Sequence, residues 1–542
     1  MADQQNDAKS ETPGAPGDAP GSGASDAQTK PNRTGLAMLA MILAVFMAIL
    51  DTSIVNVAVP KMMAVFSVSQ TEIQWVLTAY SLVVGALIPI TGYLGDRFGY
   101  KRVFVYSVLV FTIGSALCSA AWSNNSMIVF RIIQAIGGGA VMPVSMVMLF
   151  RMFPPEKRGM AMGMFGISVM FAPALGPTLS GYIVEYLDWR LIFSINVPIG
   201  IIDVFLAVSV LKEYKVDQPG KFDVWGFLTS STGLATLLYG VGIVADKGWS
   251  DKEVVIYLTI AAVCLIAFVI IELNVKRPML DLSLLKNFTF TITLLISSTA
   301  MVILMGSLFL LPVFLENVAG LSPIQTGLVL LPQAIVSGLM MPIAGALFDR
   351  IGAKPLAVIG MIITAYGLYL TRQLDVSTSF STIIGWLMIR AVGVGLVMMP
   401  VQTAGMNTVP MHKMGQGTAL SNAIRQVSAS FGIAWLALMF SNQRIFHSAA
   451  MSDQMNMFSA SVQSNVGQIQ HQFMALGQTA GQAQTSAISY IYGQIQLQST
   501  VQAMDDVFYM TAGLALVAVV LSLFMKTVKA PKGAPKEHVM GE

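Results

Sequence analysis

The chain has 542 residues, of which 55% are hydrophobic and only 11% are charged, and its formal net charge is +3. A soluble domain has roughly 25% charged residues. This composition, with a mean hydropathy of +0.69, excludes a soluble globular protein and predicts an all-α polytopic membrane protein. The two cysteines, Cys118 and Cys264, lie in apolar runs and do not indicate a disulfide framework.

The first 34 residues are rich in Gly, Pro, Ala, Ser, Asp and Gln and have almost no large apolar side chain, so we expect a disordered tail. The apolar run that follows begins too late and is too long for a cleavable signal peptide, so we expect it to be the first span. Segments long enough to cross a bilayer then recur fourteen times, at 36–60, 72–95, 103–122, 127–150, 160–183, 191–211, 224–244, 254–273, 288–315, 323–348, 355–371, 380–406, 415–440 and 506–525.

An even number of spans places both termini on one side of the membrane. If that side is the cytoplasm, 22 of the 31 Lys and Arg residues lie in cytoplasmic segments and 6 in outer segments. The remaining three, Arg131, Arg390 and Arg425, lie within spans. The positive-inside rule therefore predicts a multi-pass protein of the inner or plasma membrane with cytoplasmic termini.

The first span contains one ionisable side chain, Asp51. A carboxylate in a spanning helix costs about 3 kcal/mol or more, so we expect Asp51 to face a cavity or a partner and to carry protons or bind a ligand. Arg131 in the fourth span is a candidate counter-charge. Desolvation favours the protonated form of a carboxyl group, whereas a nearby guanidinium favours the ionised form. Small rearrangements of the helices could therefore switch Asp51 between its protonated and ionised forms. Purely structural hydrogen bonding remains the alternative for both residues.

A glycine-rich, charged loop follows the second span, and a weaker copy follows the tenth. The copies run from Gly92 to Arg102 and from Gly345 to Lys354. One copy could be an ordinary cytoplasmic loop, but two at matched topology indicate an internal repeat. We expect ion pairs that open and re-form across the cytoplasmic face, from a gate made of Gly92, Asp96, Arg97, Gly99, Lys101, Arg102, Asp349 and Arg350.

The repeat predicts two six-span bundles, at 35–211 and 287–527, with an inserted pair of spans at 212–286 and a cytoplasmic tail at 528–542. Transporters built from parallel repeats hold their substrate between the halves, near the middle of the membrane. Polar and aromatic side chains within the spans are candidates to line such a cavity, although each could equally pack within its bundle. These candidates are Asn56, Gln74, Trp75, Tyr80, Gln134, Gln333, Arg390, Gln402, Asn407, Asn422, Arg425 and Gln426.

These motifs resemble those of major facilitator superfamily transporters, in the fourteen-span drug:proton antiporter branch (EmrB/QacA type), over roughly Leu36 to Lys526. The Asp51 stretch is similar to the helix 1 motif of that branch, and the first charged loop is similar to its cytoplasmic gate motif. The stretch from Arg131 to Gly139 resembles the helix 4 motif implicated in proton coupling.

The fifth span contains a stretch that resembles the antiporter motif of the same branch. This resemblance implies a hinge that favours release of substrate to the outside over uptake. Its matching residues are Pro173, Gly176, Pro177 and Gly181. Ser180 stands where glycine is usual, and Glu316 stands where an amide is usual. The roles of Glu316 and of Asp203 are left open.

Residues 441–503 form a Gln-, Ser- and Ala-rich insertion between the last two spans. Apolar residues recur there at steps of three and four before a break at 477–481 and again after it, which predicts an outer helical hairpin. The hairpin could pack on the mouth of the protein or dock a periplasmic adaptor protein. The histidines His447 and His471 are too sparse to indicate a metal site.

No phosphate-binding G-x-x-x-x-G-K-[ST] motif occurs, so we expect no cofactor and an energy supply from an ion gradient. The leading prediction is a proton-coupled antiporter that exports amphipathic or cationic drugs, or toxic organic compounds, by alternating access. A dedicated exporter of a metabolite or lipid is the first alternative, and a membrane sensor or scaffold that does not transport is the second. No nucleophile–base pair or metal-ligand spacing indicates an enzyme, and nothing indicates nucleic-acid binding.

Overall fold

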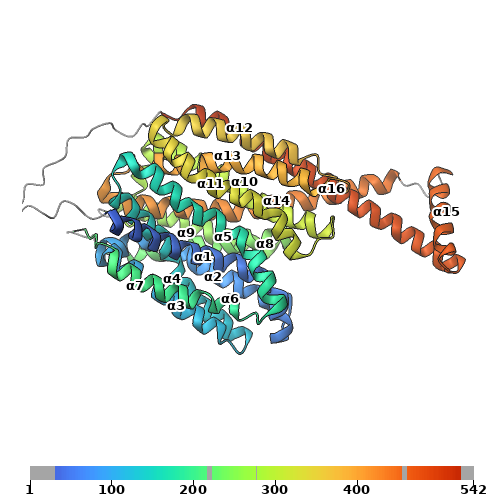
Figure 1. The fold of residues 1–542 in the computed structure, drawn as a ribbon, viewed down its shortest axis with the longest axis horizontal. Coiled ribbons are helices and arrows are strands. Elements are labelled where there is room, and N and C mark those ends of the chain that lie inside the picture. The colour runs from blue at the N-terminus through green and yellow to red at the C-terminus, as the bar shows by residue number, and fades with distance from the viewer. Residues whose placement is uncertain (1–30, 217–221, 276–277, 455–459, 527–542) are drawn as a thin grey trace, which may run out of the picture.

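The computed structural model describes residues 31–216, 222–275, 278–454 and 460–526, and these ranges contain helices and loops without strands (Figure 1). The helices are α1 (Pro31–Phe66), α2 (Gln70–Phe98), α3 (Tyr100–Ser119), α4 (Asn124–Met152), α5 (Arg158–Tyr186), α6 (Leu191–Ser194), α7 (Asn196–Val210), α8 (Val224–Lys247), α9 (Lys252–Asn274), α10 (Phe288–Asn317), α11 (Pro323–Ile351), α12 (Ala353–Thr371), α13 (Phe380–Met406), α14 (Met414–Gln454), α15 (Ala460–Ala475) and α16 (Ala480–Leu523). Short 3₁₀ turns, η1 (Pro155–Lys157), η2 (Leu282–Lys286) and η3 (Met411–Lys413), precede α5, α10 and α14.

Fourteen spans are long and apolar enough to cross a membrane, which confirms the predicted number. Helices α6 and α7 together make the sixth span, Leu191–Val210, and α15 belongs to none of them. The predicted all-α polytopic fold is therefore confirmed.

The internal repeat is visible in the local structure. Ser69 begins α2 with a capping box, and Ser322, 253 residues further on, begins α11 with another. Gly99 ends α2 at φ +96° and Gly352, again 253 residues further on, ends α11 at φ +84°. Because both φ values lie in the left-handed region, glycine is the residue that permits these turns.

The spans form two six-span bundles, α1–α7 and α10–α14 with α16, and the pair α8 and α9 is inserted between them. Helix α5 packs against α11 and, less extensively, α13, and α14 packs against α2 and, less extensively, α4, so these contacts join the bundles. Helix α8 packs on both α2 and α14 and thus covers the second seam. Helix α1 begins and α16 ends on the left of Figure 1, which we call the terminal side, and α15 projects on the right, the hairpin side.

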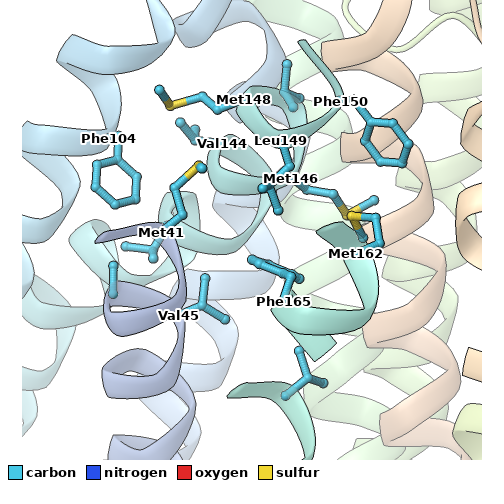
Figure 2. Close-up of a cluster of buried hydrophobic side chains, with 14 of the residues drawn as sticks. Met41, Val45, Phe104, Val144, Met146, Met148, Leu149, Phe150, Met162 and Phe165 are labelled. Atoms are coloured by element: carbon cyan, nitrogen blue, oxygen red, sulfur yellow. The ribbon is translucent and has the colours of Figure 1, made fainter. Parts of the chain in front are cut away.

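An apolar cluster packs between the helices of the N-terminal bundle and continues into α10, α11, α13 and α14 of the other bundle. Figure 2 shows Met41 and Val45 of α1 directed toward Val144 and Met146 of α4 and Phe165 of α5. Methionine is unbranched and fills irregular gaps between helices. The cluster holds α1 and α5 against α4, and thereby fixes the helices that carry the buried charges.

The insertion forms an arm that continues two spanning helices (Figure 1). Helix α14 runs on to Gln454, well past the predicted end at residue 440, and α16 starts at Ala480. No glycine or proline interrupts residues 441–454, so the helix has no sequence signal to stop. The turn at Gly477, with φ +91°, coincides with the predicted break. The disordered tail predicted at 1–34 was wrong for residues 31–34, which belong to α1, because the apolar helix extends by one turn toward the N-terminus. The rest of that tail, the tail predicted at 528–542 and residues 455–459 lie outside the described residues.

Candidate functional site

The centre of the N-terminal bundle is a buried ion pair. Asp51 of α1 is 0% exposed and Arg131 of α4 is 1% exposed. The Arg131 Nη1 donates to Asp51 Oδ2 at 2.5 Å. The guanidinium also lies over the ring of Tyr80, 4.1 Å from its centroid, and its Nε donates to the Val76 carbonyl at 3.4 Å.

Amide side chains complete the environment of the carboxyl group. Asp51 Oδ1 accepts from Gln134 Nε2 at 2.8 Å and from Asn196 Nδ2 at 2.9 Å. Gln134 in turn accepts from Arg131 at 2.6 Å and donates to Ser115 Oγ at 2.6 Å. Asp51 is therefore an acceptor in every one of its hydrogen bonds, which is the arrangement of an ionised carboxylate.

Glycines bring α3 and α4 close enough to assemble this network. A Cβ atom at Gly114 would lie 2.5 Å from the Cα of Gln134, and one at Gly137 would lie 2.9 Å from the Cα of Phe111. Both contacts are to backbone atoms, so no larger residue fits without separating the helices. The glycines thus place Gln134 beside Ser115.

Four predicted residues meet here: Asp51, Arg131, Gln134 and Tyr80. Sequence reasoning missed Asn196 and Ser115 as members of the network. Asn196 stood in a stretch singled out only as typical of the family, and Ser115 carried no signal, since serine is common in spanning helices.

The other candidates of the first half lie apart from the network. Asn56 is exposed, and its amide donates to the Thr52 carbonyl of its own helix at 3.2 Å. Gln74 is exposed, and Trp75 is 44% exposed and stacks on Tyr239 of the inserted α8, with ring centroids 5.6 Å apart. None of the three lines either of the two cavities described below.

The C-terminal bundle pairs its buried arginines with amides instead of acids. Arg390 donates to Gln333 Oε1 at 2.8 Å, and both line a cavity between the bundles. Arg425 donates to Gln402 Oε1 at 3.0 Å, and both line a smaller cavity within the bundle.

Two more candidates of the second half are engaged elsewhere. Asn422 is buried and donates to the Thr418 carbonyl of its own helix at 2.9 Å. Asn407 accepts from Arg158 Nη1 of α5 at 2.9 Å, so it joins the two bundles at the terminal side. Gln426 of α14 is half-buried and lines neither cavity.

The first charged loop holds helix ends of the N-terminal bundle together. Asp96 accepts from the Tyr100 hydroxyl at 2.9 Å and lies 3.7 Å from Arg151 of α4. Lys101 and Arg102 donate through their backbone N–H groups to Glu213 beyond α7, at 3.0 and 3.3 Å. The side chain of Arg97 is exposed.

At the terminal side, the two bundles are in contact through the second copy of the charged loop and through glycines. Asp349 accepts the backbone N–H groups of Gly159 and Met160, at the first turn of α5, at 3.0 Å each. A Cβ atom at Gly92 would lie 2.8 Å from the carbonyl carbon of Gly415 on α14. Arg350, the second predicted gate residue of this copy, is exposed.

The predicted hinge residues lie on α5, between α1 and the C-terminal bundle. A Cβ atom at Gly176 would lie 2.8 Å from Cβ of Ser53, two residues after Asp51. On the opposite bundle, a Cβ atom at Gly181 would lie 2.7 Å from Ile324 of α11. Pro173 lines the cavity between the bundles, and Pro177 lies inside the same helix.

Two acidic residues with open roles are also placed. Asp203 of α7 is 0% exposed, and neither of its carboxyl oxygens has a hydrogen-bond partner in the described part of the chain. Glu316 lies in the last turn of α10 and is exposed. Across residues 31–216, 222–275, 278–454 and 460–526, no group of three or more His, Cys, Asp or Glu side chains could hold a metal ion.

Two six-span bundles around a cavity, with a buried ion pair in one of them, define a multi-pass membrane protein of the transporter class. The chain matches the Major Facilitator Superfamily over residues 41–433. Curated relatives support the same family. The chain is 38% identical over 499 residues to the uncharacterized MFS-type transporter YhcA of Bacillus subtilis (strain 168), covering 91% of this chain and 93% of YhcA. The chain belongs to the Major Facilitator Superfamily.

A named exporter and a solved structure are also similar. The multidrug export protein EmrB of Haemophilus influenzae is 32% identical over 489 residues, which cover 88% of this chain and 92% of EmrB. The structure of the proton:xylose symporter XylE aligns with a TM-score of 0.58 at 14% identity, over 92% of this chain and 97% of XylE. That structure supports the fold alone.

Proposed function

We propose that this protein is a secondary active transporter that exports amphipathic organic compounds, including drugs, in exchange for protons. The similarity to a relative named as a multidrug export protein supports the substrate class. The buried Asp51–Arg131 pair supports the coupling to protons, and it is the observation that carries the proposal.

The pair can act as a switch because its two charges depend on each other. A proton on Asp51 removes the counter-charge of Arg131, and breaking a buried ion pair in this way is strongly unfavourable, by about 3–5 kcal/mol. The guanidinium must then find other partners, which requires movement of α1 against α4. Proton binding thereby favours a second arrangement of the helices.

Helix α5 offers a route from this pair to the cavity. Ser180 of α5 donates to the Ile54 carbonyl of α1 at 2.6 Å, three residues after Asp51. Another part of α5, Val169 to Ala174, lines the cavity that Arg390 also lines. A movement of α1 would therefore be transmitted through α5 to the wall of the cavity.

The energy source and orientation belong to the same proposal. The terminal side faces the cytoplasm, where protons arrive, and the membrane potential adds about 2.3 kcal/mol per charge for each 100 mV. The arm made by the ends of α14 and α16 with α15 then lies on the outer side, where Ile445, Phe446 and Leu476 expose apolar surface. Docking of a periplasmic adaptor protein on this arm stays a prediction.

Reconstituted protein tests the coupling. Proteoliposomes with an imposed pH gradient are given two fluorescent probes that share a dansyl group, the cation dansylcadaverine and the anion dansylglycine. We expect the gradient to move at least one probe through the wild-type protein. Movement should fall to the level of protein-free vesicles in Asp51→Asn, which cannot carry the proton.

Asp375→Asn is the matched control, because Asp375 lies exposed in the loop between α12 and α13. It should transport like wild type. Equal rates in wild type and Asp51→Asn, or rates that ignore the gradient in wild type, would contradict proton antiport.

A further inference from the structure

The cavity between the bundles has an apolar wall and one charged group. It has a volume of about 60 Å³ for the centres of water-sized molecules, and it is lined by α5 from one bundle and by α10, α11 and α13 from the other. Methionines contribute much of the wall, namely Met170, Met301, Met305 and Met398. Arg390, with Gln333 and Ser337, supplies the polar part.

Arg390 has no charged partner in this position. It is 4% exposed, and within the described residues its single side-chain hydrogen bond is the one from Nη2 to Gln333. Its Nη1 is buried without a hydrogen-bond partner, and no carboxylate in these residues lies within 4.0 Å of the guanidinium. A buried cation without a counter-charge is costly, so an anion that enters the cavity would be stabilised there.

Comparison of the two repeats shows which residue of the first bundle corresponds to Arg390. Gly137 of α4 packs on Ser107 and Phe111 of α3, and Gly393 of α13 packs on Gly360 and Thr364 of α12. Gly114 lies against Gln134 in the same way as Gly367 lies against Arg390. Arg390 therefore occupies in its bundle the position that Gln134, a hydrogen-bond donor to Asp51, occupies in the first.

The acid of the first bundle has no counterpart beside Arg390. Helix α10 precedes α11 as α1 precedes α2, and the residues of α10 that line the cavity, Met301, Leu304, Met305 and Leu308, are all uncharged. On the neighbouring helices, Glu316 lies in the last turn of α10 and Asp349 in the last turn of α11, away from the cavity.

A second buried arginine of the same bundle also lacks an acidic partner. Arg425 of α14 is 7% exposed, its partner is the neutral Gln402, and its Nε has no hydrogen-bond partner among the described residues. Gln402 lies on α13, the helix that carries Arg390. Within the described part of the C-terminal bundle, two buried cations are thus present and no acid is paired with either one.

We propose that this cavity binds amphipathic organic anions, with the negative group of the substrate on Arg390 and its apolar part among the methionines. The inference rests on the proposed export function and narrows its substrates to anions. A guanidinium donates two parallel hydrogen bonds to a carboxylate, and Nη1 is free to donate one here. A cation in the same place would face the charge of Arg390 without a compensating acid.

Equilibrium binding to the purified full-length protein tests the anion site without a gradient. The probes are dansylglycine, dansylcadaverine and the neutral dansylamide, which differ in charge and share the fluorescent group. We expect wild type to bind dansylglycine most tightly. Arg390→Gln should weaken that binding about tenfold or more, as loss of a charge-assisted hydrogen bond does, and should leave dansylamide binding unchanged.

Two further variants distinguish the effect of losing the charge at residue 390 from an effect on folding. Arg390→Lys keeps the charge and should retain part of the preference for dansylglycine. Arg444→Gln removes an exposed arginine from the arm and should bind like wild type. Thermal unfolding and gel filtration show whether Arg390→Gln is folded. If it is not, the affinities of wild type and Arg390→Lys for dansylglycine are compared instead.

The outcomes distinguish this site from the proposed antiport. Tighter binding of dansylcadaverine than of dansylglycine, absence of dansylglycine binding, or equal dansylglycine binding in wild type and Arg390→Gln would overturn the anion site. Gradient-driven movement of dansylcadaverine would still support antiport in those cases. Conversely, dansylglycine binding that depends on Arg390 supports the site even if transport ignores the pH gradient.

Discussion

Buried charges in the two bundles are stabilised by different partners. In the first bundle, Arg131 has the carboxylate of Asp51 and donates to one of its oxygens, and Asn196 and Gln134 donate to the other. In the second, the side-chain partners of Arg390 and Arg425 among the described residues are amide oxygens. The first bundle is thereby suited to exchange a proton, and the second to hold a negative ligand.

At the same scale, the pair of Asp281 and Lys413 makes stability depend on pH. Asp281 Oδ2 accepts from Lys413 Nζ at 2.6 Å, in the loops before α10 and α14. Burial raises the pKa of Asp281, but the hydrogen bonds from Lys413 and Ser283 outweigh it and hold the pKa below its usual value. A carboxyl group with a lowered folded pKa stabilises the protein above its unfolded pKa of about 3.9, and loses that effect as the pH falls through the folded pKa.

We therefore expect Asp281→Asn to lower the thermal unfolding temperature at pH 7 and to make little difference at a pH below the folded pKa. Unfolding of detergent-solubilised protein, followed by tryptophan fluorescence at several pH values, measures this. The exposed Asp188 provides the control variant Asp188→Asn. A difference between Asp281→Asn and wild type that persists unchanged at the lowest pH would contradict the role of the ion pair.

At the scale of the element, contact between α3 and α4 decides whether the polar network forms. Gly137 lies against backbone atoms of Ser107 and Phe111, which cannot move aside as a flexible side chain can. The resulting close approach brings Gln134 within 2.6 Å of Ser115. The packing of two helices thus controls a hydrogen bond next to Asp51.

Gly137→Ala should separate the two helices. We expect a loss of about 1–3 kcal/mol in stability, typical of overpacking, together with reduced gradient-driven transport. Gly385→Ala on α13 is the matched control, since a Cβ atom at Gly385 meets nothing within 4 Å. Equal thermal stability of the two alanine variants would show that the α3–α4 contact tolerates a methyl group.

At the scale of the whole molecule, the interface of α5 and α11 joins the bundles and passes the cavity. Asp349 binds the first turn of α5 at the terminal side, and Arg158 binds Asn407 nearby. An acceptor at a helix N-terminus is favoured by its free N–H groups and by the helix dipole. These contacts hold α5 of the first bundle against the second bundle at the terminal side.

Asp349→Ala should shift the protein toward an arrangement open at the terminal side. Loss of the charge-assisted hydrogen bonds is expected to change the ratio of the two arrangements by about tenfold, or 1.4 kcal/mol. Spin labels at the exposed Lys157 and Arg350 would report it as a larger population of long distances. Asp375→Ala serves as the control. Identical distance distributions in wild type and Asp349→Ala would show that the contact of Asp349 with α5 does not hold the two bundles together.

Much of this architecture follows from the sequence alone. The number of spans, the repeat and the family depend on hydrophobic length and on local motifs, which act within one helix or one loop. Asp51 and Arg131 could be singled out because a charge in a spanning helix is rare and costly wherever it lies. The break in the outer arm was predictable from glycine for the same local reason.

Partners of uncharged residues were decided by the tertiary structure. Asn196 and Ser115 join the network, and Asn407 leaves the predicted cavity for the contact with Arg158, because helix packing sets which side chains meet. The absence of an acid beside Arg390 is also a property of three-dimensional neighbours. A sequence fixes which helices cross the membrane through their own composition, whereas contacts between helices depend on where glycines let backbones approach.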